Sequence, residues 1–277
     1  MGTTQRTDAA WMAGCAELVA RLERPDFAAA FTALLRQVVP VDTLLVTFYF
    51  RDRPPRTVYH ELPPELVALC VDTYAAGVYR LDPFFQTFEA GIADGVHRLR
   101  DLAPDNFYRS TYYRTFYRDT GAEDEMGLFR RLDANRGLVV SLARAPGARP
   151  YGVAQRRRLE AAFPLLITAA CRHWEDAASR HWEDAAGPAA EAADPVASHV
   201  ARFGDGLLSE REQEVAGLIL MGHSTLSISH RLAISEGTVK AHRKHIHAKL
   251  GIASQAELFA RFLKTLPLRP PDGPGRR

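Results

Sequence analysis

The sequence predicts an α+β fold for the N-terminal part of the chain and a separate all-α unit of four helices at the C-terminal end. Two segments rich in β-branched and aromatic residues, 42–50 and 56–62, favour an antiparallel pair of strands. A second pair, 127–133 and 138–145, is joined by an Asn-Arg-Gly turn. Helical patterns lie on both sides of these strands, and helices around a meandering antiparallel sheet are typical of an α+β domain.

Three amphipathic segments are the expected helices of this first domain. Residues 8–37 favour one or two helices, because apolar residues recur there at near-helical spacing. Pro63 and Pro64 open a helix that continues to about Ala76. A helix over 153–178 has a continuous apolar stripe and closes the domain. We therefore expect the first domain to span residues 8–178.

The formal net charge of +2 is an average over three unequal parts of the 277-residue chain. Residues 1–170 hold 21 Arg, no Lys and 20 acidic residues, residues 171–200 hold 2 Arg and 6 acids, and residues 201–277 hold 12 basic residues and 7 acids. All four lysines lie at position 240 or later. Their absence before that point excludes a GxxxxGK[ST] phosphate loop and lysine Schiff-base chemistry in the first domain.

A tandem repeat, RHWEDAAS followed by RHWEDAAG, covers residues 172–187 and precedes an Ala-, Gly- and Pro-containing stretch. The preferred interpretation is a helix end lengthened by duplication that leads into a linker over 179–205. The alternative is that Trp182 extends a helix used for dimerisation, although eight added residues do not keep a heptad register. The Pro- and Gly-rich residues 267–277 predict a disordered tail.

Four helix signals follow one another over residues 207–263. Ser209 and Glu212 have the spacing of a capping box, and Gly222 is placed to end that first helix. Ser224 and Ser235 are the expected caps of the second and third helices. We expect Leu226, Ile228 and Leu232 to supply the core side of the second helix. Two short helices joined by a tight turn, with a cationic second member, predict a helix-turn-helix.

The helix over 236–250 divides into a core face and a cationic face. At 100° per residue, Val239, Ile246 and Leu250 share a narrow arc. The opposite side alternates long donors with small residues, which suits a surface pressed into a DNA major groove. Phosphate contacts are expected at the flanks of this helix and at the start of the preceding one. The predicted DNA-binding residues are Lys240, Lys244, Thr238, Ala241, His247, Arg243, Ser224 and Thr225.

The stretches LSEREQEV, MGHS, ISEGTVKAH and KLG within 207–263 resemble the LuxR-type (NarL-type) DNA-binding domain. The resemblance implies that the third helix reads DNA, usually as a dimer on an imperfect palindrome. Where the family has Asn-Lys-Glu-Ile-Ala after the serine of the second helix, this chain has Thr225-Leu226-Ser227-Ile228-Ser229. That difference removes a family phosphate contact at Leu226.

Aromatic residues are dense between 74 and 117, where Asp82 precedes Pro83. Two interpretations stay open. The aromatics are ordinary core and Asp82 only caps a helix that starts at Pro83. Alternatively, the carboxylate and tyrosine hydroxyls face a small-molecule site, where they would accept from and donate to a ligand. The candidate ligand-binding residues are Asp82, Tyr74, Tyr79, Phe84 and Tyr112.

The segment TYAAGVYRLDPFF resembles the Tyr-x4-Tyr-x3-Asp-Pro stretch of LuxR-type autoinducer-binding domains, with two residues instead of three between Tyr79 and Asp82. The resemblance implies a GAF/PAS-like α+β fold for the first domain, with a ligand pocket of the quorum-sensing kind.

The sequence as a whole predicts a DNA-binding transcriptional regulator, with no enzymatic activity and no cofactor. Its expected partners are double-stranded DNA, an unidentified small molecule, a second copy of the chain and RNA polymerase. The alternatives are a constitutive dimeric DNA-binding protein, whose first domain only dimerises or binds a partner, and an enzyme fused to a DNA-binding unit. No metal site is expected, although His242, His245 and His247 share one helix. With no apolar run long enough for a membrane span and no signal peptide, a cytoplasmic location is expected.

Overall fold

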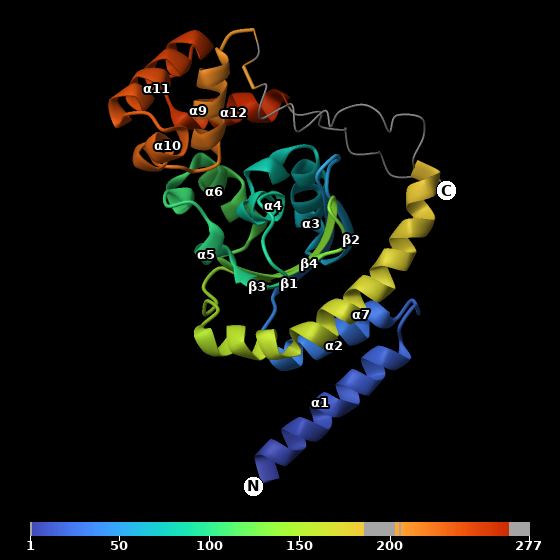
Figure 1. The fold of residues 1–277 in the computed structure, drawn as a ribbon. Helices are drawn as coiled ribbons and strands as arrows, with labels where there is room; N and C mark the ends of the chain where they lie inside the picture. The colour runs from blue at the N-terminus through green and yellow to red at the C-terminus, as the bar shows by residue number, and fades with distance from the viewer. Residues whose placement is uncertain (1, 186–202, 205, 266–277) are drawn as a thin grey trace.

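A five-stranded antiparallel sheet forms the centre of the first domain (Figure 1). The computed structural model describes residues 2–185, 203, 204 and 206–265. The strand order is β2-β1-β5-β4-β3. The strands are β1 (Thr43–Phe50), β2 (Arg56–Glu61), β3 (Gly95–Arg98), β4 (Asp124–Arg131) and β5 (Arg136–Arg144). The α+β fold class is therefore confirmed, while β3 forms in a segment from which no strand was expected.

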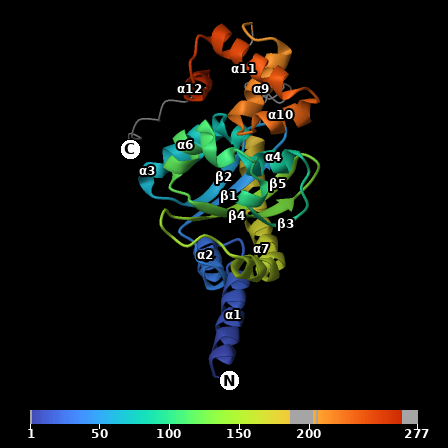
Figure 2. The ribbon, with the colours of Figure 1, turned by 90° about the vertical axis from the view of Figure 1, so that its left-hand side faces the viewer.

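Helices α2 (Phe27–Val38) and α7 (Val153–Ala185) lie on one face of this sheet, and α1 (Gly2–Ala20) packs against α2 and extends away from the sheet (Figure 1, Figure 2). They bury the side chains that alternate residues of the central strands direct to that face, including Val46, Phe48 and Val140. Trp174 of α7 joins the helices to the sheet, since its ring packs edge-on against Phe31 of α2 at 5.2 Å and stacks on Tyr59 of β2 at 5.7 Å. The segment 8–37 thus forms two helices, and α7 continues as helix beyond the expected boundary at 178.

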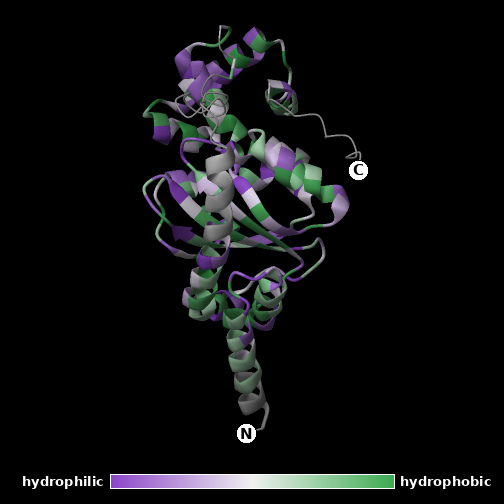
Figure 3. Ribbon diagram, turned by 90° about the vertical axis from the view of Figure 1, so that its right-hand side faces the viewer, coloured by the Kyte–Doolittle hydropathy of each residue, from purple (hydrophilic) through white to green (hydrophobic). Residues whose placement is uncertain are grey.

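The opposite face of the sheet is covered by short helical turns that connect the strands. Figure 2 shows these turns between the sheet and the C-terminal helices. In Figure 3, green bands alternate with white and purple ones along the strands, as expected when both faces differ in polarity. The turns are α3 (Pro64–Val67), a π-helical turn (Ala68–Thr73), 3-10 turns at Val78–Leu81, Phe107–Arg109 and Tyr117–Thr120, and helices α4 (Pro83–Glu89), α5 (Leu99–Leu102) and α6 (Thr111–Thr115).

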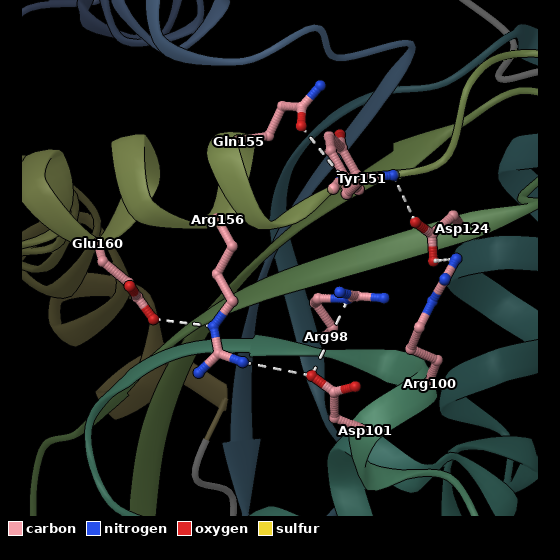
Figure 4. Close-up of polar contacts among 9 residues, drawn as sticks. Arg98, Arg100, Asp101, Asp124, Tyr151, Gln155, Arg156 and Glu160 are labelled. Carbon is pink, nitrogen blue, oxygen red and sulfur yellow. Dashed lines mark hydrogen bonds and ion pairs between the residues drawn. The ribbon is translucent and has the colours of Figure 1, made fainter.

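Asp124 fixes the beginning of β4 through two charged or polar partners (Figure 4). Its carboxylate accepts a hydrogen bond of 2.7 Å from the backbone N–H of Tyr151 and lies 3.1 Å from the guanidinium of Arg100. The first contact holds the loop that precedes α7, and the second holds α5. The residue that follows, Glu125, consequently has a defined direction toward the other face of the sheet.

The C-terminal four-helix unit consists of α9 (Glu210–Leu220), α10 (Thr225–Leu232), α11 (Glu236–Leu250) and α12 (Gln255–Thr265). The expected caps are confirmed: Ser209 and Glu212 form a capping box, and the hydroxyls of Ser224 and Ser235 accept from backbone N–H groups of α10 and α11. The core side of α10 is corrected at one position. Ile228 is fully buried, but Leu226 is 51% exposed, because it lies in the first turn on the outer side of the helix.

Parts of the predicted organisation lie outside the described residues, namely most of the 179–205 linker and the 267–277 tail. The side chains of the second RHWEDAA copy also lie outside them. Within the described part of the chain, no helix is both long and apolar enough to cross a membrane. In the same residues, no three His, Cys, Asp or Glu side chains gather as a metal ion would require.

Candidate functional site

A cavity of about 80 Å³ lies between the sheet and the turns that cover it. Its walls are mainly apolar, with a few hydroxyl and carboxyl groups among them. Strand β1 contributes every second residue, Thr43, Leu45, Thr47 and Tyr49, as the pleat requires. The other lining residues are Leu62, Cys70, Tyr74, Asp82, Tyr112, Phe116, Tyr117, Thr120, Ala122, Glu125, Ser141 and Ala143.

Asp82 caps α4 and also lines the cavity. One carboxylate oxygen accepts a hydrogen bond of 2.8 Å from the backbone N–H of Phe84 and so caps α4. The other accepts a hydrogen bond of 2.5 Å from the hydroxyl of Tyr74, whose oxygen is 2.9 Å from the Tyr49 hydroxyl. Burial raises the pKa of Asp82, and the hydrogen bonds from Tyr74 and Phe84 oppose that shift.

Glu125 brings a second carboxyl group to the same cavity. The hydroxyl of Tyr117 donates a hydrogen bond of 2.7 Å to Glu125, and Ser141 is a further hydrogen-bonding partner. Burial is the largest cause that raises the pKa of Glu125, and the negative charge of Asp82 is the next. Because charges interact more strongly in a site shielded from water, the ionisation of each carboxyl group affects the other.

The predicted ligand-binding residues fall into two groups. Asp82, Tyr74 and Tyr112 line the cavity. Tyr79 and Phe84 are not among its lining residues: the Tyr79 ring packs edge-on against Phe85 at 4.5 Å, and the Phe84 ring against Phe129 at 5.2 Å.

Sequence reasoning missed several members of the cavity, Glu125 and Tyr49 above all. Tyr49 sits in the first strand, far along the chain from the aromatic cluster. Glu125 stands in an acidic run, Glu123-Asp124-Glu125, that reads as an exposed turn. The alternation along β4 could have placed Glu125 on the cavity side of the sheet. It shares that face with Phe129, whereas Met126 and Leu128 lie on the other face.

The predicted recognition helix α11 has its core side buried and its cationic side accessible. Val239 and Ile246 are fully buried, and Leu250 is 3% exposed. The exposed members of the predicted DNA-binding set on this helix are Lys240, Lys244, Thr238 and Ala241, while Arg243 and His247 are partly buried. Among the ion pairs of the described residues, none involves Lys240 or Lys244. Two cationic side chains without counter-ions therefore stand on one helix face.

The beginning of α10 contacts the first domain. The Ser224 hydroxyl donates a hydrogen bond of 2.7 Å to the carboxylate of Asp105, and the Ser224 backbone N–H donates to the other oxygen at 3.3 Å. Thr225 follows at the first helical position and is partly buried. A carboxylate therefore occupies the position at which the sequence predicts a DNA phosphate.

The two domains share one apolar core through α6 and the turn before it. Tyr112 lines the cavity, and its ring lies 6.4 Å from the ring of Phe259 on α12. Gly222, with φ of +93°, approaches Phe107 so closely that a Cβ atom there would lie 3.0 Å from the Phe107 Cα. The wall of the cavity is thus in direct contact with the four-helix unit.

Comparisons with known proteins agree with both parts of this architecture. The luxR family of bacterial regulatory proteins matches residues 206–262. A putative HTH-type transcriptional regulator in the exeN 3' region of Aeromonas salmonicida is 33% identical over 186 residues, which is 67% of this chain and 94% of that protein. The oxygen regulatory protein NreC of Staphylococcus aureus is 43% identical over 58 residues, 21% of this chain and 27% of NreC.

The first domain has a structural relative of its own. The crystal structure of the VqsR LBD domain from Pseudomonas aeruginosa is 26% identical, with a TM-score of 0.52, and the match covers 60% of this chain and 97% of that one. The helix-turn-helix unit thus matches the luxR family model, and the α+β domain before it resembles the VqsR LBD domain. The chain belongs to the LuxR family of DNA-binding transcriptional regulators.

Proposed function

We propose that this regulator senses a small molecule in the cavity of its first domain and passes the binding event to its DNA-binding unit. The observation that carries the proposal is the position of Tyr112, which lines the cavity on one side and packs against Phe259 of α12 on the other. A ligand that moves this ring changes the support of the four-helix unit, so it shifts the equilibrium between two arrangements of the domains.

DNA recognition is assigned to α11, with Lys240 and Lys244 reaching base edges in the major groove. Thr238, Ala241, Arg243 and His247 would complete the contact surface, and Ser224 and Thr225 would hold a phosphate. We further propose that two copies act as a dimer on two half-sites, in the cytoplasm where the DNA is. The cavity beside α6 favours ligand sensing. A first domain that served only for dimerisation would not need one.

The proposal is tested with a cavity-filling variant, Ala143→Met, because Ala143 lines the cavity and is 4% exposed. The fraction below about 1 kDa of an extract from the source cells should raise the melting temperature of the wild type by a few degrees and that of the variant much less. Native mass spectrometry of the same samples should give the added mass and the dimer. An equal shift for both proteins, or none for the wild type, contradicts ligand binding in this cavity.

The contact between Asp105 and Ser224 gives a separate prediction. Asp105→Ala should raise the affinity for operator DNA on the order of fivefold, because it frees the start of α10 from a carboxylate that competes with phosphate. Fluorescence anisotropy at fixed salt measures the effect. Asp119→Ala is the matched control, since Asp119 is exposed and also loses one negative charge. If both variants bind equally tightly, the Asp105 contact does not hold back DNA binding.

A further inference from the structure

The cavity contains two carboxyl groups and no basic side chain among the described residues that line it. Asp82 reaches it from the residue that caps α4, and Glu125 reaches it from β4. The first domain contains many arginines, so a shortage of basic residues does not explain why none lines the cavity. Each carboxyl group contacts neutral donors instead: Tyr74 and the Phe84 N–H for Asp82, Tyr117 for Glu125.

The neighbouring residue Asp124 is a buried carboxylate outside the cavity, and it is paired with a basic side chain. Asp124 is 3% exposed, and the guanidinium of Arg100 lies 3.1 Å from it (Figure 4). One residue further along β4, on the other face of the sheet, the partly buried Glu125 lines the same cavity as Asp82, and no basic side chain is among the other lining residues. Burying a carboxylate without a counter-charge is unfavourable, and a second acid nearby increases that cost. The cavity therefore favours an occupant that carries positive charge.

We propose that the ligand of this cavity is a compact organic cation, such as a short aliphatic amine or diamine, bound with its ammonium hydrogens toward Asp82 and Glu125. The inference rests on the proposed function, because it assumes that the cavity is the ligand site. The volume of about 80 Å³ limits the charged part of the ligand to a few heavy atoms. Ammonium groups donate three hydrogen bonds, and Tyr117 and Ser141 leave acceptor capacity on the carboxyl oxygens of Glu125.

Binding of such a cation is coupled to protons. Burial raises the pKa of Asp82 and raises that of Glu125 to about 8, so a cation that needs both groups ionised releases a proton when it binds near neutral pH. Its affinity should therefore increase between about pH 6 and pH 8. Burial raises the pKa of the surrounding tyrosines and of Cys70, so they stay neutral in this range. The titratable groups that line the cavity with Glu125 are Asp82, Cys70, Tyr49, Tyr74, Tyr112 and Tyr117, and Asp124 acts on it electrostatically from the opposite face of β4.

Three probes with the same number of heavy atoms test the inference on the full-length protein. They are 1,3-propanediol, 3-amino-1-propanol and 1,3-diaminopropane, which differ in charge and hardly in size. Isothermal titration calorimetry in two buffers of different ionisation enthalpy gives the affinity and the number of protons released. We expect the diamine to bind at least about tenfold more tightly than the diol, with the amino alcohol between them.

Glu125→Gln should reduce diamine affinity about tenfold and leave the diol unaffected, because the amide keeps the shape and removes the charge. Asp82→Asn tests the other carboxyl group while retaining a residue that caps α4. Glu65→Gln is the control, since Glu65 is an exposed carboxylate in the neighbouring α3. Equal affinity of the wild type for the three probes, or unchanged diamine binding by Glu125→Gln, overturns the inference.

The same measurements separate this inference from the function on which it rests. If the amines bind no better than the diol but the cell-extract fraction still stabilises the wild type and not Ala143→Met, the cavity is a ligand site for an uncharged molecule. If the extract fraction also fails to discriminate between these two proteins, the proposed sensing function fails with it.

Discussion

Replacing Lys240 and Lys244 together by alanine is expected to lower operator affinity by about 100-fold or more without unfolding the protein. Both side chains are exposed on α11 and are in none of the ion pairs of the described residues. The buried side of the helix, with Val239 and Ile246 at 0% exposure, is untouched by the change. Each lost contact to a base edge or phosphate is worth about 1–3 kcal/mol, which gives the size of the combined effect.

The measurement is footprinting and fluorescence anisotropy over a range of salt concentrations. Loss of two charged contacts should also reduce the slope of log affinity against log salt, because fewer counterions are released from the DNA. Arg157→Ala combined with Lys264→Ala is the control, since it removes two exposed charges elsewhere. A footprint of normal strength with the Lys240 and Lys244 variant would falsify the assignment of α11 as the recognition helix.

Glu212→Gln is expected to destabilise the four-helix unit by about 2–3 kcal/mol at neutral pH. The side chain is 5% exposed, its carboxylate lies 2.7 Å from the Lys249 ammonium, and it accepts a hydrogen bond of 2.8 Å from the Ser209 N–H. One carboxylate thereby joins the start of α9 to the last turn of α11. The glutamine retains a hydrogen bond to the helix start and loses the charge pair.

The pH dependence of this effect has a definite sign. The Lys249 hydrogen bond and the Ser209 N–H lower the pKa of Glu212 to about 2, against 4.5 for the free side chain. A depressed carboxyl pKa stabilises the fold above the unfolded value and ceases to do so as the pH falls through the folded one. The difference between wild type and Glu212→Gln should thus be constant above about pH 5.5 and shrink between about pH 4.5 and pH 2.

Hydrogen exchange of the α11 amides measures this stability locally. Tryptophan fluorescence cannot, because all three tryptophans lie at position 182 or earlier, outside the four-helix unit. Exchange should become about 30- to 100-fold faster in Glu212→Gln. Glu214→Gln is the control, since Glu214 is on the same helix and pairs with Arg211 while 54% exposed. Equal exchange in both variants would show that the Lys249 pair contributes nothing to α11.

The helix-turn-helix was predictable because its determinants are local. Ser209, Ser224 and Ser235 each cap the helix that follows, and Gly251 adopts the left-handed conformation after α11. These contacts span three or four residues, so the sequence order contains them directly. The failure at Leu226 is of another kind. Its apolar character predicted burial, but Leu226 lies on the outer side of α10, away from the core of the unit.

The positions of all strands except β3 were predictable from the sequence. The order of the strands in the sheet was not. Alternation and turn residues locate β1, β2, β4 and β5, while the short strand Gly95–Arg98 has no pattern long enough to register. The order of strands depends on the long connections through α3 and α4, and through α5 and α6, which cross over the sheet and which the local pattern does not encode.

By itself the sequence determined the family, the α+β class, the four helices of the DNA-binding unit and the division of α11 into a core and a cationic face. Periodicity and capping fix these features within a few residues of chain. Only the tertiary structure decided that Glu125 meets Asp82 in one cavity and that Asp105 binds Ser224, 119 residues away. Which charges face one another is set by sheet order and domain contact, because electrostatic interaction depends on distance in space and not on separation along the chain.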